Sequence, residues 1–108
     1  MPYVVMLTDS AVGDLEDLDS HITWYDSSER ADYVLSRIEE AIAGLSEHPE
    51  RGVFPQELSE LGIRSYREVF FKPYRIIYRV IENTVYIYLI VDGRRDMQSL
   101  LSRRLLNG

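Results

Sequence analysis

Residues 67–95 read REVFFKPYRIIYRVIENTVYIYLIVDGRR, with two dense runs of β-branched and aromatic residues around a short polar break. Such runs favour an extended, pleated backbone, and Glu82-Asn83-Thr84 supplies the turn. Because side chains alternate across a strand, the run from Tyr74 to Val80 presents apolar groups on both faces. The sequence therefore predicts an antiparallel hairpin at the centre of a sheet, covered by helices on one face and at least partly covered on the other.

The residues before this hairpin predict a strand and two helices. Pro2–Leu7 is a short apolar run, and Thr8-Asp9-Ser10 after it contains good helix N-cap residues. A first amphipathic helix with an acidic outer face follows, and Asp26-Ser27-Ser28-Glu29 resembles a capping box that starts a second helix. The second helix is expected to end at His48-Pro49. The apolar stripes comprise Leu15, Leu18, Ile22 and Tyr25 in the first helix, and Ala31, Val34, Leu35, Ile38, Ile42 and Leu45 in the second.

The remaining segments complete a single α+β domain over residues 1–108. Residues 49–62 read as a connector with one helical turn at Gln56–Leu61, and Ile63–Phe71 predicts a further strand. Asp96 is placed to cap a short last helix. We expect an N-terminal strand and an antiparallel helical hairpin packed on an antiparallel sheet, with a C-terminal three-strand meander and a short terminal helix.

Composition excludes several classes of site. The chain has no cysteine, so it offers no disulfide, thiolate metal site or thiol nucleophile, and we expect neither a metal nor a cofactor. No apolar run approaches the roughly 18 residues of a membrane span. The N-terminus lacks the features of a signal peptide, so we expect a cytoplasmic protein that does not engage a membrane.

The net charge of −6 conceals an uneven distribution. Residues 1–62 hold 14 acidic and three basic side chains, whereas residues 63–108 hold four and nine. One interpretation is a solvated acidic helix pair beside an ordinary sheet. The other is a basic working face formed by the sheet and the C-terminal segment, with an acidic scaffold behind it.

Three segments carry a resemblance to a known family. They are PYRIIYRV at Pro73–Val80, VDGRRD at Val91–Asp96, which leads into SLLSRRLL, and Leu-x-x-His-Pro-Glu-x-Gly at Leu45–Gly52. In this order and spacing they resemble the RelE/ParE toxin superfamily, the small toxins of bacterial type II toxin–antitoxin modules. The resemblance spans most of the chain. It implies a compact α+β fold and a cognate antitoxin whose C-terminal segment wraps the toxin in a hetero-oligomer.

The superfamily divides by mechanism, and the arginines bear on the division. RelE-like members are ribosome-dependent mRNA endonucleases, whereas ParE-like members poison DNA gyrase. Arg75 matches an arginine that RelE-like nucleases place on the corresponding strand, and Arg95 or Arg94 matches another near the chain end. The basic pair of the preceding strand would fall near Arg67 and Val69, so one member at most is kept.

The groups that would move protons do not carry over. Cleavage of RNA through its 2′-hydroxyl needs a base, cations and an acid. Leu100 or Leu101 replaces the tyrosine expected in the final helix, and Lys72 is the sole lysine. Arginine is a poor general base because its pKa exceeds roughly 12. His21 and His48 fall in the helical half, where a helix-surface and a helix-end histidine are expected.

We therefore interpret the chain as a ParE-like, plasmid-stabilising toxin that binds DNA gyrase and is neutralised by a cognate antitoxin with an acidic, hydrophobic segment. The alternatives are an mRNA endonuclease acting on the ribosome with Arg75, Arg95 and Arg67, and a degenerate member that only binds antitoxin. Arg75 and Arg79 could instead pair with Glu68, Glu82 or helix carboxylates, and the tyrosines and leucines could simply pack. Residues expected to contact target or antitoxin are Arg67, Arg75, Arg94, Arg95, Tyr86, Tyr88, Leu101 and Leu105.

Overall fold

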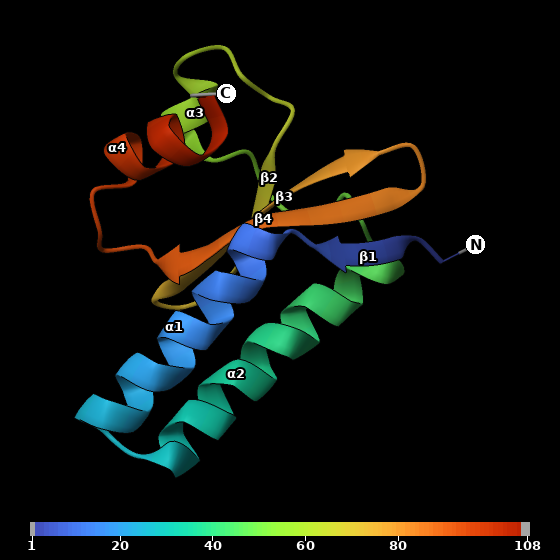
Figure 1. Cartoon of the computed structure of the whole chain (residues 1–108). Coiled ribbons are helices and arrows are strands. Elements are labelled where there is room, and N and C mark those ends of the chain that lie inside the picture. The colour runs from blue at the N-terminus through green and yellow to red at the C-terminus, as the bar shows by residue number, and fades with distance from the viewer. Residues whose placement is uncertain (1, 107–108) are drawn as a thin grey trace.

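The computed structural model describes residues 2–106 and confirms the α+β class (Figure 1). Four strands form one sheet, and two long helices lie against one of its faces. In chain order the elements are β1 (Val4–Leu7), α1 (Asp9–Tyr25), α2 (Ser28–Ala43), the 3₁₀ turn η1 (Gly44–Ser46), α3 (Gln56–Ser59), β2 (Arg67–Phe71), β3 (Tyr74–Ile81), β4 (Thr84–Asp92), α4 (Met97–Leu101) and the π-helical turn η2 (Ser102–Leu106).

The sheet has the strand order β1-β4-β3-β2. Strands β2, β3 and β4 form the expected antiparallel meander, with a two-residue turn between β3 and β4. Strand β1 pairs with β4 in parallel, with Val4 opposite Thr84, so the sheet is mixed rather than wholly antiparallel. The alternation of side chains has the same period in both kinds of strand, and the sequence pattern therefore gave no direction for β1.

The helical hairpin buries one face of the sheet. Thr8 caps α1 by accepting a hydrogen bond from the Ala11 amide, as expected. The cap of α2 is Ser27 rather than Asp26, because the Ser27 hydroxyl accepts from the Arg30 amide and the Asp26 N–H still belongs to α1. The end of α1 projects beyond the sheet (Figure 1), which explains why Tyr25 is 74% exposed instead of joining the apolar stripe. The main buried residues here are Ala11, Ile22, Ala31, Val34, Ile38, Ile42, Leu45, Ile76, Tyr78, Val85, Ile87 and Ile90.

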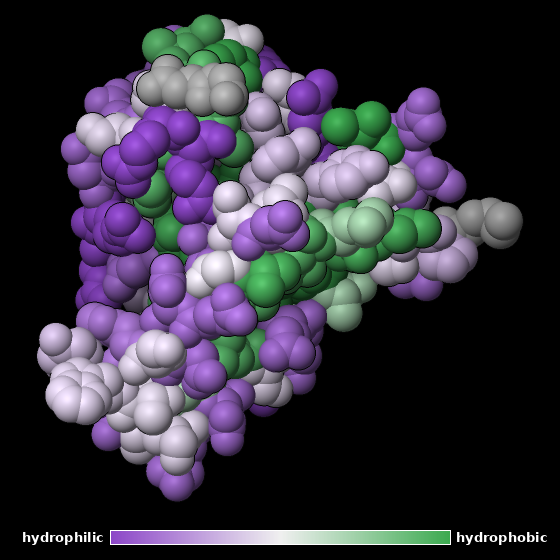
Figure 2. Space-filling model, in the orientation of Figure 1, coloured by the Kyte–Doolittle hydropathy of each residue, from purple (hydrophilic) through white to green (hydrophobic). Residues whose placement is uncertain are grey.

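The other face is covered by the chain itself over only part of its area. Helices α3 and α4 supply Leu58, Met97, Leu100 and Leu101, which pack with Ile77, Leu89 and Val91 of the sheet. Beyond this second core, Val4 and Met6 of β1 are 53% and 51% exposed. Figure 2 shows hydrophobic side chains running along this part of the molecule, where Figure 1 places β1. Thus the expected partial cover exists, and an apolar strip of the sheet is left open beside it.

Within residues 2–106, no helix has the length and apolar character needed to cross a membrane.

Candidate functional site

Arg75 of β3 is held between two carboxylates on the face that carries the second core. Its guanidinium donates two hydrogen bonds to Glu57 of α3, at 2.8 and 2.7 Å, and two to Glu68 of β2, at 2.6 and 3.1 Å. The Arg75 side chain is 13% exposed and that of Glu68 is 5% exposed. The pairing with Glu68 is the structural alternative that the sequence left open, and it occurs here together with a second partner.

The two carboxylates respond differently to this shared cation. The pKa of Glu57 is lowered, chiefly by its hydrogen bonds to Arg75. The pKa of Glu68 is raised, because burial of the carboxylate outweighs its hydrogen bonds to the same guanidinium. The pKa of Arg75 is raised further above its ordinary value, first by Glu57 and also by Glu68. One cation with two carboxylates leaves little positive charge to attract a phosphate.

Arg67 lies on the opposite face of the sheet from Arg75. It pairs across the strands with Tyr78, whose side chain enters the helix-covered core. Its guanidinium donates to the Gly52 carbonyl at 2.9 Å and stacks over the Phe54 ring at 4.6 Å from the centroid. Tyr78 is three residues from Arg75 along β3, so the strand position opposite Arg67 lies about 10 Å from Arg75 at the usual rise of a strand.

Arg94 and Arg95 lie in the turn after β4, and both are exposed. Arg94 is bound to the carboxylate of Asp92 at 2.6 Å, and this contact lowers the pKa of Asp92. The Arg95 side chain has no polar partner among residues 2–106. Both arginines border a cavity of about 440 Å³ between α1 and the end of β4.

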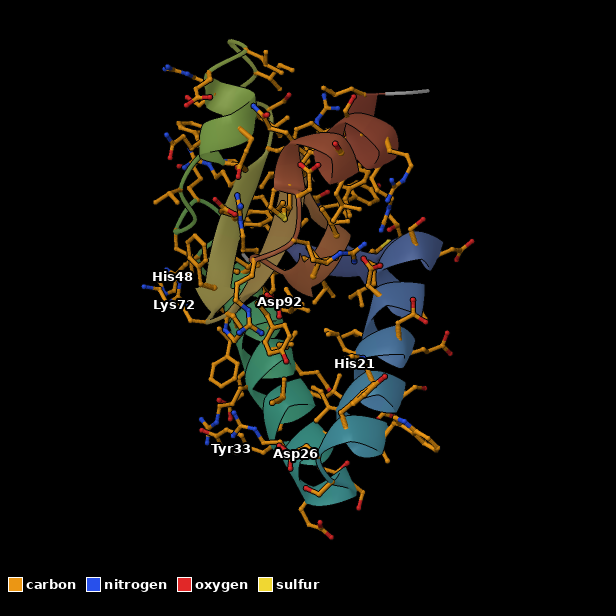
Figure 3. The ribbon with its side chains drawn as sticks, turned by 90° about the vertical axis from the view of Figure 1, so that its left-hand side faces the viewer. His21, Asp26, Tyr33, His48, Lys72 and Asp92 are labelled. Carbon is orange, nitrogen blue, oxygen red and sulfur yellow. The ribbon has the colours of Figure 1, made fainter. Side chains whose placement is uncertain are left out.

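The same cavity contains His21, which the sequence had placed apart from the arginines. Its full lining is Asp14, Asp17, Leu18 and His21 of α1, with Tyr74, Ile90, Val91, Asp92, Arg94 and Arg95. His21 is on the helix surface as expected, and its ring lies 4.6 Å from that of Tyr25. Figure 3 shows His21 on α1 and Asp92 on the facing sheet. Only the packing of α1 along β4 brings this histidine to the arginine turn, and no sequence signal indicated it.

The four apolar and aromatic candidates are divided between surface and core. Tyr86 is partly exposed on the open face of β4, between Met6 and Arg79 in the strand register. The other three belong to the second core: Tyr88 packs edge-to-face on Tyr66 at 5.6 Å, Leu105 is partly buried, and Leu101 is 1% exposed. In this conformation Leu101 therefore has no side-chain surface to offer a partner.

A partly buried ion pair that the sequence did not reveal holds the C-terminal segment. Arg104 binds the Asp14 carboxylate of α1 at 3.1 and 3.0 Å and donates to the Tyr88 carbonyl at 3.0 Å. The same carboxylate accepts from the Ile90 amide at 3.0 Å. The partners are 90 residues apart, so no local pattern could have indicated the contact. Over residues 2–106, no cluster of three or more His, Asp or Glu side chains could hold a metal ion.

The fold matches solved structures of bacterial toxins. A structure described as the chromosomal ParDE toxin–antitoxin system from P. aeruginosa superposes with a TM-score of 0.70, at 18% identity over 83% of this chain and 95% of that one. The toxin–antitoxin complex RelBE2 from Mycobacterium tuberculosis gives 0.61, at 26% identity over 85% and 92%. A mutant of the E. coli toxin RelE in the free state gives 0.65, at 14% identity over 98% and 97%.

The sequence comparison is more specific. No curated protein matches the chain. The family model described as the ParE toxin of type II toxin–antitoxin system, parDE, matches residues 5–97, which include both long helices and the whole sheet except the first residue of β1. The chain therefore belongs to the ParE toxin family of type II toxin–antitoxin systems.

Proposed function

We propose that this protein is the toxin of a ParDE-type module that inhibits DNA gyrase by binding it, and that a cognate antitoxin neutralises it. Family membership supports the toxin role, and two of the similar structures are toxin–antitoxin systems. The choice of binding over catalysis rests on the arrangement of the arginines.

The candidate phosphate-binding arginines do not converge. A nuclease that cuts through the 2′-hydroxyl has to place its cations around one phosphate, within hydrogen-bond reach. Here Arg67 and Arg75 extend from opposite faces of the sheet, and Arg95 lies in a turn that borders a third region. Arg75 would also have to release Glu57 and Glu68 before it could bind a phosphate. This dispersal is the observation that carries the proposal.

One observation favours the second candidate, ribosome-dependent cleavage of mRNA. His21 borders the same cavity as Arg94 and Arg95, so a group capable of proton transfer lines a cavity together with two candidate phosphate-binding arginines. In such an enzyme His21 would act as the base and Arg95 would bind the phosphate. Arg67 and Arg75 would take no part.

Expression of the toxin without antitoxin separates these candidates. We expect growth arrest, loss of gyrase supercoiling activity and intact message. Arg94→Gln with Arg95→Gln should relieve the arrest, whereas His21→Gln should leave it unchanged. Arg103→Gln, at another exposed arginine, is the matched control. Message cleaved on the ribosome, with a dependence on His21, would establish the nuclease, and unimpeded growth by the folded wild type would indicate a protein that only binds antitoxin.

The antitoxin has a suitable surface on the open part of the sheet. Val4, Met6 and Ile81 are each at least 40% exposed there, and Tyr86 and Arg79 lie between them in the strand register. A hydrophobic segment with acidic residues would cover the apolar strip and meet the Arg79 cation. Met6→Glu should weaken antitoxin binding while growth arrest persists. Equal binding by this variant and the wild type would place the antitoxin elsewhere.

A further inference from the structure

Helix α2 carries opposite charges on its two solvent-facing flanks. Asp32 and Glu39 lie on the flank toward α1, where they border a hollow together with Asp19. On the other flank, Arg30 and Arg37 lie two turns apart on either side of Tyr33. Their guanidinium carbons are 5.2 and 5.3 Å from the centroid of the Tyr33 ring, and the tyrosine is 46% exposed. Two cations are thus fixed around one accessible aromatic ring.

This cationic flank runs beside strand β2. The Tyr33 ring packs edge-to-face on Phe71 of β2 at 6.1 Å, and Lys72 follows directly in the turn. Figure 3 shows Tyr33 and Lys72 on the same side of the molecule. Phe70, the neighbour of Phe71, is 46% exposed.

The far end of the flank is hollowed. A depression of about 220 Å³ lies between α2 and β2, lined by Ala41, Arg51, Glu68, Val69 and Phe70. Arg51 is the third and last basic residue of residues 1–62, so all three basic residues of the acidic half lie along this border. The charge of Glu68 is balanced by Arg75. We define the α2–β2 border as Arg30, Tyr33, Arg37, Arg51, Phe70 and Lys72.

Strand β2 also has a free edge at this border. It is the outermost strand, and within residues 2–106 only Glu68 of β2 exchanges backbone hydrogen bonds outward, with Val53 at 2.7 and 3.0 Å. The backbone N–H and C=O of Phe70, two residues further along, point outward in the same way and have no hydrogen-bond partner on that side among residues 2–106. An unpaired N–H and C=O beside an exposed aromatic ring can accept an extended peptide.

We propose that the α2–β2 border docks an extended, acidic and aromatic peptide segment of a partner protein. Guanidinium groups bind carboxylates with matched two-pronged geometry. Tyr33 lies on the helix-covered side of β2 and Phe70 projects on the side of Arg75, so an extended peptide along this edge, whose side chains alternate in direction, can meet the cations beside Tyr33 with its carboxylates and the Phe70 ring with its aromatic groups. The incoming carboxylate would compete with the Arg37–Glu40 pair at 2.9 Å. Both of those side chains are about half exposed or more, and such surface pairs are weak.

A peptide fits this border better than a nucleic acid. The chain carries a net charge of −6, and the acidic flank of α2 lies just beyond the border. Electrostatic interactions extend about 8 Å at physiological salt, so a short segment meets mainly the cations, whereas a long polyanion also meets the acidic flank.

The test is fluorescence anisotropy with a labelled short peptide of alternating glutamate and phenylalanine. We expect salt-sensitive binding that Arg30→Gln with Arg37→Gln weakens about tenfold, a loss equivalent to about 1.4 kcal/mol. Arg64→Gln with Arg103→Gln removes the same charge from exposed positions elsewhere and should bind as the wild type does. Methylation of the peptide's backbone nitrogens on its β2-facing side should also weaken binding.

Several outcomes would overturn this inference. They are absence of binding, equal binding of a lysine–phenylalanine peptide, equal losses in the two double variants, and no effect of N-methylation. Tighter binding of single-stranded DNA of equal charge, with the same sensitivity to Arg30 and Arg37, would assign the border to nucleic acid instead. None of these results depends on whether gyrase is the target, so the inference and the proposed function can fail independently.

Discussion

Glu57 and Arg75 form a two-bond ion pair that fastens helix α3 to strand β3. Helix α3 has four residues, too few to be stable alone. Its attachments to the sheet are this ion pair and the buried Leu58 side chain, which is 1% exposed. The pair therefore has a structural role at a position where family resemblance suggests a phosphate contact.

Replacing Glu57 with glutamine should destabilise the protein. The side chains of Arg75 and Glu57 are 13% and 24% exposed, so the pair is intermediate between a buried and a surface ion pair. We expect the free energy of unfolding to fall by about 1–2 kcal/mol. Urea denaturation measures it, with Glu47→Gln at an exposed site as the control. Equal stabilities of the two variants would show that α3 is held without this ion pair.

The contribution of Glu57 should depend on pH. Its pKa is lowered in the folded protein, so its stabilisation is complete above the ordinary glutamate value of 4.5 and is lost as the pH falls through the lower, folded-state pKa. The difference in free energy of unfolding between wild type and Glu57→Gln should thus shrink below pH 4.5. Denaturation curves across the acidic range test this, and a constant difference would contradict it.

The contribution of Glu68 to stability should depend on pH with the opposite sign. Burial raises its pKa, so its ionisation costs the folded protein stability as the pH rises from 4.5 through the folded-state pKa. Relative to wild type, Glu68→Gln should become more stable across that interval. The same pH series measures it. If Glu68→Gln instead loses stability relative to wild type as the pH rises, the stabilisation of the ionised Glu68 carboxylate by Arg75 outweighs the cost of its burial.

The pair between Asp14 and Arg104 should control how firmly the C-terminal segment is held. Asp14→Asn removes the charge that binds Arg104, while an oxygen can still accept from the Ile90 amide. We expect faster hydrogen exchange in α4 and residues 102–106. Because the two residues bind each other, the double variant Asp14→Asn with Arg104→Gln should lose less free energy of unfolding than the two single variants lose together. Arg103→Gln, at an exposed neighbouring position, should leave hydrogen exchange unchanged. If the losses of the two single variants simply add in the double variant, Asp14 and Arg104 are not coupled.

Contacts that arise from regular patterns could be predicted from the sequence. The hairpin strands follow from their β-branched and aromatic runs, and Thr8 and Asp96 cap helices as expected. The Arg75–Glu68 pair was foreseeable because neighbouring strands bring such side chains together. Local patterns could not show whether β1 runs parallel to β4.

The candidate site was harder to predict than the fold. Glu57 lies in the short helix α3 between α2 and β2, and only the packing of α3 against the rest of the fold brings Glu57 to Arg75. His21 reaches the arginine turn through the docking of α1 along β4, which no spacing in the sequence encodes. Side chains that meet across distant elements depend on how those elements pack, and periodicity describes each element separately.

The hydroxyl of Tyr78 joins two of the segments that carry the family resemblance. It donates to the Pro49 carbonyl at 2.7 Å and accepts from the Gly52 amide at 3.0 Å. A Cβ atom at Gly52 would lie 2.6 Å from that hydroxyl and 2.7 Å from the Glu68 backbone oxygen. Position 52 therefore needs glycine because strand β3 and strand β2 both approach its backbone.

Gly52→Ala should be strongly destabilising, and Tyr78→Phe should not rescue it. The phenylalanine removes the close hydroxyl but leaves the Glu68 carbonyl oxygen in place. We expect Gly52→Ala to cost about 1–3 kcal/mol, and Tyr78→Phe alone to cost about 1–2 kcal/mol because the buried Gly52 N–H loses its acceptor. Thermal and urea unfolding measure both. Gly13→Ala is the matched control, since an added Cβ meets nothing within 4 Å and alanine favours the helix. If Gly52→Ala with Tyr78→Phe is as stable as Tyr78→Phe alone, the contact with the Glu68 carbonyl oxygen relaxes and only the Tyr78 hydroxyl excludes a side chain at position 52.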